Sequence, residues 1–86
     1  MADNKQNTIV FSSEEFKQEN IKLIMRTVHD ALVERGYNPV RQIVGYLTTS
    51  DPAYISSYKG ARTLIQTVDR DDIVKELVRS YLQSNE

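Results

Sequence analysis

The chain of 86 residues has no cysteine and no tryptophan, and it has a single histidine, His29. Without cysteine there is no disulfide framework and no thiol chemistry. A metal site would have to be built from carboxylates, and the clustered Asp69, Asp71 and Asp72 are explained as residues that begin a helix. We therefore expect this protein to hold neither a metal ion nor a cofactor.

Catalytic motifs are also missing. His29 is the one available imidazole base, and its neighbour Asp30 projects about 100° away around a helix, so we expect no Ser-His-Asp arrangement. The three glycines lie far apart, so the chain has neither a phosphate-binding loop nor a dinucleotide-binding fingerprint. We expect a protein that is not an enzyme.

Long apolar runs and a strong charge imbalance are absent as well. No stretch approaches the roughly 20 apolar residues of a membrane helix, and residues 1–7 lack the apolar centre of a signal peptide. The net charge is −1, and no part of the chain has the basic footprint typical of nucleic-acid-binding domains. We expect a cytoplasmic protein that does not insert into a membrane, and the charge counts against nucleic acid as a partner.

The signals that are present specify helices. Ser12 and Glu15 have the spacing of a capping box. They predict a helix over about residues 13–35, which Gly36 ends by supplying a left-handed backbone conformation. The N-terminal part of the fold is therefore predicted to be one long helix.

Asn38 followed by Pro39 predicts the start of a second, shorter helix. Its apolar residues recur with helical spacing and predict a buried stripe: Val40, Ile43, Val44 and Leu47. Gly45 lies inside this helix, where glycine costs roughly 1 kcal/mol relative to alanine. We therefore expect another part of the chain to pack closely against Gly45.

The remaining residues predict a brief helical turn at Asp51-Pro52, a helix over about residues 58–68 and a last helix over about residues 70–83. The last helix has one broad apolar face: Ile73, Val74, Leu77, Val78, Tyr81 and Leu82. We expect an all-α fold, a small single-domain helical bundle of four main helices and one short helical turn. Residues 1–11 are expected to be a flexible N-terminal tail and residues 12–86 the helical domain.

Several apolar or amphipathic residues are candidates for an interface. Phe16 and Leu23 lie roughly 110° from the centre of the first helix's apolar face, so they either widen the core or contact a partner subunit. Tyrosines are frequent at interfaces, and those between residues 37 and 58 either cover helix junctions or form a shared surface. Because a chain this short buries only about 60 % of its unfolded surface, we expect a homodimer. The candidate interface residues are Phe16, Leu23, Tyr46, Tyr54 and Tyr58.

Residues 39–68 also admit a helix-turn-helix interpretation, in which Lys59 and Arg62 near the start of the later helix would contact DNA phosphates. The connection between the two helices is longer than the 3–4 residues usual in that motif. A dimeric helix-turn-helix-like DNA-binding regulator that uses residues 52–68 is therefore the alternative function.

A series of motifs occupies the middle of the chain: Gly36-Tyr37-Asn38-Pro39, Gln42-Ile43-Val44-Gly45-Tyr46, Asp51-Pro52-Ala53-Tyr54-Ile55 and Ala61-Arg62. Together they resemble the IreB family, small regulatory phosphoproteins of Firmicute-type bacteria. The similarity continues through residues 70–78 and 80–82, and it covers about residues 8–82.

The resemblance implies a cytoplasmic, helical, dimeric protein without enzymatic activity. It implies as partners a transmembrane Ser/Thr kinase with extracellular PASTA repeats, the cognate phosphatase and an unidentified downstream protein, in cell-envelope stress signalling. Family members are phosphorylated on N-terminal threonines before the first helix, and Thr8 matches one of them, whereas Lys5 stands at the position of the other.

We expect the phosphate on Thr8 to act in one of two ways. It either engages a cation, for which the candidates are Arg41, Lys59 and Arg62, or releases residues 9–11 from an apolar groove.

Overall fold

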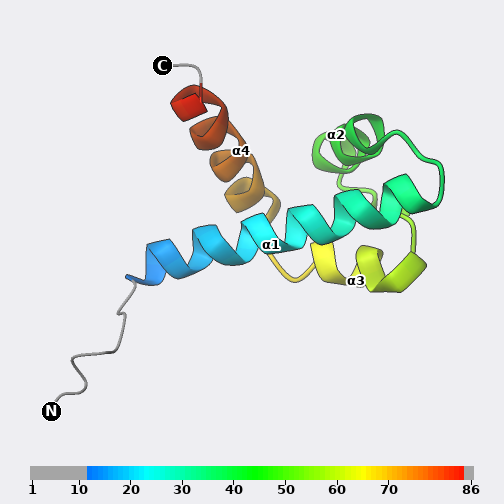
Figure 1. The fold of residues 1–86 in the computed structure, drawn as a ribbon, viewed down its shortest axis with the longest axis horizontal. Helices are drawn as coiled ribbons and strands as arrows, with labels where there is room; N and C mark the ends of the chain where they lie inside the picture. The colour runs from blue at the N-terminus through cyan, green and yellow to red at the C-terminus, as the bar shows by residue number, and fades with distance from the viewer. Residues whose placement is uncertain (1–11, 85–86) are drawn as a thin grey trace, which may run out of the picture.

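The computed structural model describes residues 12–84, and the all-α fold predicted from the sequence is confirmed for this range (Figure 1). The four main helices are α1 (Ser13–Glu34), α2 (Pro39–Thr49), α3 (Ala61–Ile65) and α4 (Arg70–Ser84). Two short 3-10 helices, η1 (Pro52–Tyr54) and η2 (Tyr58–Gly60), lie between α2 and α3. The expected flexible tail, residues 1–11, lies outside the described residues.

α1 begins and ends where the sequence predicts, because both ends are determined by neighbouring residues. The Ser12 hydroxyl accepts a hydrogen bond from the Glu15 N–H (3.1 Å), and Glu15 accepts one from the Ser12 N–H (2.9 Å). At the other end Gly36 has φ +82°, and the Tyr37 N–H donates to the Leu32 carbonyl at 2.9 Å. These are the bonds of a capping box and of a left-handed helix end.

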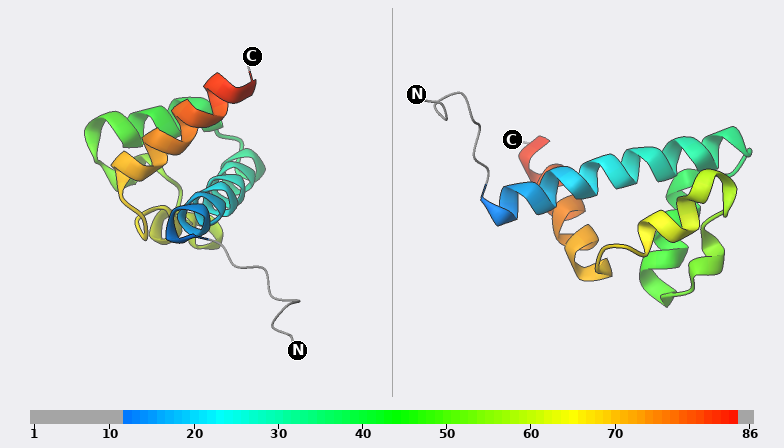
Figure 2. Two further views of the ribbon diagram at one scale, coloured as in Figure 1. Left: turned by 90° about the vertical axis from the view of Figure 1, so that its left-hand side faces the viewer. Right: turned by 90° about the horizontal axis from the view of Figure 1, so that it is seen from below.

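The other helices pack around α1, which is the longest element. Figure 1 shows α2 and α3 on different sides of the C-terminal half of α1, while α4 crosses nearer its N-terminal half; Figure 2 gives the same arrangement from two further directions. The core lies where these elements meet: Ile21, Ile24, Val28, Ala31, Leu32, Tyr46, Ile55, Ala61, Ile65 and Ile73. None of the helices in residues 12–84 has the length and apolar character needed to cross a bilayer.

The stripe predicted for α2 is only half buried, so the prediction is wrong for Val40 and Val44. Val40 is 70 % exposed and Val44 is also exposed, while Ile43 and Leu47 pack against the core. The face of α2 that meets the core is centred near the buried Tyr46. Val40 and Val44 are turned roughly 120–160° from Tyr46 about the helix axis, so they stay exposed within residues 12–84.

The helix predicted over residues 58–68 is also wrong, because the backbone breaks at its start. Lys59 (φ 53°) and Gly60 (φ 73°) adopt left-handed conformations, and α3 ends at Ile65. Two contacts hold the kink: Glu34 accepts a hydrogen bond from the Tyr58 hydroxyl and pairs with Lys59 Nζ, each at 3.0 Å. A tertiary contact with α1 therefore overrides the local helical pattern.

α4 forms as predicted, but most of its apolar face is uncovered. Ile73 is fully buried against the core, and Glu76 is buried beside it with 6 % exposure. The rest of the face is exposed: Val74, Leu77, Val78, Tyr81 and Leu82. We call these five residues the α4 stripe. Within residues 12–84 the broad apolar face predicted for this helix is therefore buried at Ile73 and exposed at the α4 stripe.

Candidate functional site

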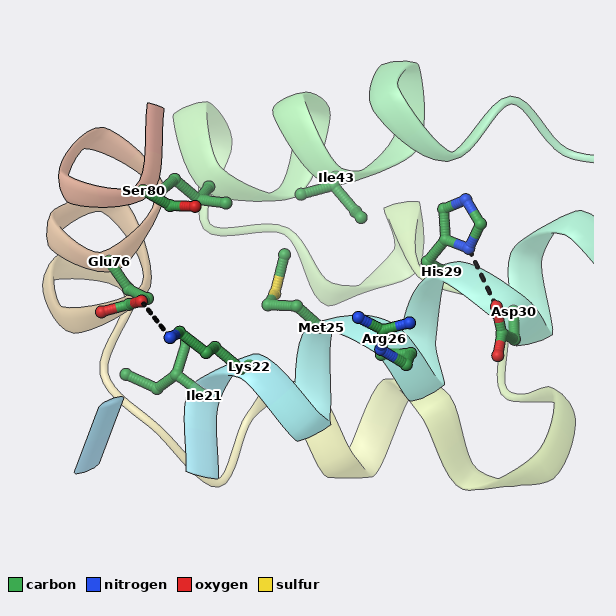
Figure 3. Close-up of a pocket in the computed structure, with 10 residues that line it drawn as sticks. Ile21, Lys22, Met25, Arg26, His29, Asp30, Ile43, Glu76 and Ser80 are labelled. Atoms are coloured by element: carbon green, nitrogen blue, oxygen red, sulfur yellow. Dashed lines mark hydrogen bonds and ion pairs between the residues drawn. The ribbon is translucent and has the colours of Figure 1, made fainter. Parts of the chain in front are cut away.

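An open groove of about 510 Å³ lies between α1, α2 and α4. Figure 3 shows the side chains that line it. The floor is apolar and the rim is polar. The floor is made by Ile21, Met25, Ile43 and Leu77, and the rim by Lys22, Arg26, His29, Asp30, Glu76 and Ser80. Val40 and Val44 on α2 and the α4 stripe extend the apolar surface beyond the groove. An exposed apolar surface of this kind is typical of a protein-binding site.

His29 and Asp30 lie within hydrogen-bond distance of each other beside the groove, with 3.0 Å between His29 Nδ1 and Asp30 Oδ1. The expectation that Asp30 cannot orient His29 is therefore wrong, because the two exposed side chains bend towards each other. A nucleophile is nevertheless not assembled with them. Ser80 lies at the opposite end of the groove, on α4 (Figure 3). Within residues 12–84 no group of His, Cys, Asp or Glu is placed to hold a metal ion.

The candidate interface residues divide into two groups. Phe16 and Leu23 are both about two-thirds exposed, which removes the wide-core interpretation for them. Tyr46 is only 5 % exposed, so it is a core residue and its assignment to an interface is wrong. Tyr54 packs against Gly45, which confirms the predicted close approach at that glycine.

Tyr58 belongs to a contact between η2 and the end of α1. Its ring lies under the charged groups of Arg35 and Lys59, 5.1 and 5.4 Å from the centroid. Hydrogen bonds from Lys59 and Tyr58, together with the charge of Lys59, hold the pKa of Glu34 below its ordinary value. The same carboxylate raises the pKa of Lys59. Lys59 is therefore already paired.

The three cations expected to meet a phosphate are not brought together. Arg62 Nε donates to the Ile55 carbonyl at 2.8 Å, so its guanidinium supports the segment between η1 and η2. Arg41 is exposed in the first turn of α2. Arg41 belongs to α2 and Arg62 to α3, so the two cations lie on different helices. Thr8 lies outside the described residues.

The geometry of residues 39–68 also weakens the DNA-binding alternative. α3 has five residues, which is too short for a helix that reads a major groove. Lys59 pairs with Glu34, and Arg62 bonds to a backbone carbonyl. Both side chains therefore already have partners within the described residues.

A cluster of charges at the crossing of α1 and α4 was missed by the sequence analysis. Arg79 lies between Glu76 (2.7 Å) on its own helix and Glu14 (3.6 Å) on α1. Lys17 on α1 pairs with Asp72 on α4 at 3.6 Å. The spacing of Glu76 and Arg79 could have indicated the contact within α4, but no sequence signal pairs Arg79 with a residue on α1.

Residues 12–84 therefore define a small all-helical domain with an open groove lined largely by apolar side chains. The family model of the IreB regulatory phosphoproteins matches residues 6–83. Because this match covers nearly the whole chain, the protein belongs to the IreB regulatory phosphoprotein family, as its motifs predicted.

Proposed function

We propose that this protein is a non-catalytic regulator whose activity is set by phosphorylation of Thr8. A transmembrane Ser/Thr kinase of the PASTA type adds the phosphate, and the cognate phosphatase removes it, in response to cell-envelope stress. The observation that carries the proposal is the family match, which covers residues 6–83 and so includes Thr8. We place the protein in the cytoplasm, where the ATP-dependent domain of such a kinase acts.

The shape of the domain supports a regulator that works by binding. The groove between α1, α2 and α4 is open, has an apolar floor and is flanked by further exposed apolar residues. Surfaces of this kind favour protein partners over small polar substrates. The output of the protein is therefore contact with a downstream protein, and phosphorylation changes that contact.

Homodimer formation is part of the same proposal. The α4 stripe lies beside the groove, because Leu77 belongs to both. An interface between two identical copies is self-complementary, so α4 of each copy fits the groove of the other. Such pairing would cover the apolar surface that one small chain leaves exposed.

The test of the phosphorylation step is phosphosite mapping by mass spectrometry on protein from its native cells, with and without cell-wall stress. We expect stress-dependent phosphate on Thr8 that disappears when the kinase is deleted and accumulates when the phosphatase is deleted. A Thr8→Ala variant should abolish the signal, and a Thr63→Ala variant, which changes an exposed threonine on α3, should leave it intact. An unmodified Thr8 in cells with an active kinase would contradict the proposal.

A further inference from the structure

The length of the chain limits where a phosphate on Thr8 can act, and this inference rests on the proposed phosphorylation. Ser12 is four positions after Thr8 in the sequence, so their Cα atoms lie within about 14 Å of each other in any conformation. Glu34, the partner of Lys59, lies 22 residues after Ser12 on α1, about 33 Å along the axis. Within one chain, the phosphate falls well short of Lys59.

The cations within range lie at the crossing of α1 and α4. Lys17 is five residues after Ser12, about 7.5 Å along the helix axis. Arg79 reaches Glu14 in the first turn of α1. Lys17, Lys75 and Arg79 line one narrow cleft between the two helices, together with Glu14, Asp72 and Glu76. Three cations from two helices therefore surround a point that Thr8 can reach.

Two of the ion pairs between α1 and α4 at this cleft are long, and Lys75 is unpaired within residues 12–84. Lys17–Asp72 and Arg79–Glu14 each span 3.6 Å, longer than the roughly 2.7–2.9 Å of a strong charge-assisted hydrogen bond. Glu14 is largely exposed and can turn into solvent. Lys75 has no side-chain partner within residues 12–84.

Arg79 keeps its orientation through a stronger contact. Its Nη1 lies 2.7 Å from an oxygen of the buried Glu76, which leaves Nη2 directed towards Glu14. A phosphate carries about −1.5 to −2 charge and three acceptor oxygens. It therefore binds these cations more strongly than the single carboxylate of Glu14 does.

We propose that phosphothreonine at position 8 binds Lys17, Lys75 and Arg79 of its own chain and holds α4 against α1. Glu76 and Leu77 on α4 form one wall of the groove. Fixing α4 therefore fixes the groove and the orientation of the α4 stripe, so that the phosphate changes the docking surface without entering it.

The test uses the full chain with phosphothreonine installed at position 8 during translation, so that no kinase is needed. Amide hydrogen exchange and a ³¹P titration are measured on this protein and on the unmodified chain. We expect amide hydrogen exchange in residues 73–78 to slow by about fivefold or more on phosphorylation. We also expect the second pKa of the phosphate to be lower in the folded protein than in the same protein unfolded in urea.

Two variants make the result specific to the crossing. Lys75→Gln in the phosphorylated chain should bring the hydrogen exchange of residues 73–78 most of the way back to that of the unmodified chain, and the phosphate pKa most of the way back to that of the unfolded chain. The variant should fold normally, because Lys75 is exposed and unpaired in the described residues. Arg41→Gln, an exposed cation on α2, is the matched control and should change neither. Equal exchange in the two forms, or an effect lost in Arg41→Gln instead, would overturn the proposal. Because the phosphate is supplied without a kinase, this outcome is independent of whether Thr8 is modified in cells.

Discussion

The aromatic ring of Tyr54 packs against the backbone of Gly45 and occupies the space that a Cβ atom at position 45 would need. Gln42 helps to hold it there, because its side-chain amide donates to the Tyr54 carbonyl at 2.8 Å. The contact joins the middle of α2 to η1 and explains why a glycine is placed inside a helix.

Gly45→Ala is expected to destabilise the protein by about 1–3 kcal/mol, because overpacking against the ring outweighs the gain in helix propensity of roughly 1 kcal/mol. Urea denaturation measures the change. In a Tyr54→Ala background the aromatic ring that would clash with the new methyl group is absent, so the same Gly45→Ala change should become stabilising. A stabilising effect with Tyr54 present would show that the ring moves aside freely.

Ser50 ends α2 in a left-handed conformation with φ 68°, a geometry that glycine adopts at lower cost. Ser50→Gly is therefore expected to raise the free energy of unfolding by about 0.5–1 kcal/mol. Ser50→Ala keeps the conformational cost and is the matched control. Thermal unfolding followed by circular dichroism should give Ser50→Gly a higher midpoint temperature than both the wild type and Ser50→Ala. A lower midpoint for Ser50→Gly would contradict the backbone argument.

The contact between Glu34 and Lys59 predicts a pH dependence of stability. Hydrogen bonds from Lys59 and Tyr58 lower the pKa of Glu34 below its ordinary value of 4.5. A carboxyl group with a lowered folded-state pKa stabilises the fold above its unfolded pKa and loses that effect as the pH falls. Stability should therefore decrease as the pH falls below about 4.5 and through the lowered pKa of Glu34.

Glu34→Gln and Lys59→Met should each flatten this part of the acid unfolding curve, because each removes one side of the contact. At high pH the dependence of stability on pH has the opposite sign, because it is set by Lys59. The pKa of Lys59 is raised from 10.5, so its contribution is complete below that value and is lost as the pH rises through the raised pKa. An acid limb that is unchanged in both variants would mean that the contact does not persist in solution.

A charge on the α4 stripe should disrupt the proposed homodimer. Val78→Glu places a carboxylate on the exposed stripe of α4, where burial against a second copy would leave it without a partner. Sedimentation velocity should show a dimer for the wild type and a monomer for Val78→Glu, with helical content retained. Thr63→Glu, on the exposed side of α3, should remain dimeric. A monomeric wild-type protein would contradict the pairing.

The sequence by itself determined the features that depend on neighbouring residues. The starts of α1 and α2 are closed by side chains three residues away from the backbone groups they bind, and α1 ends at the left-handed Gly36, so local signals were sufficient. The cost of a helical glycine likewise pointed to a close contact at Gly45. The family motifs identified the class of protein without any geometry.

Tertiary structure alone decided which apolar residues are covered and which charges meet. Helical periodicity shows that Val44 and Val78 are on apolar faces, but only the positions of the neighbouring helices leave both exposed. The break at Lys59 depends on Glu34, and the pair between Arg79 and Glu14 joins residues from nearly opposite ends of the described chain. These features follow from how α1 is packed against the other elements, which no local pattern encodes.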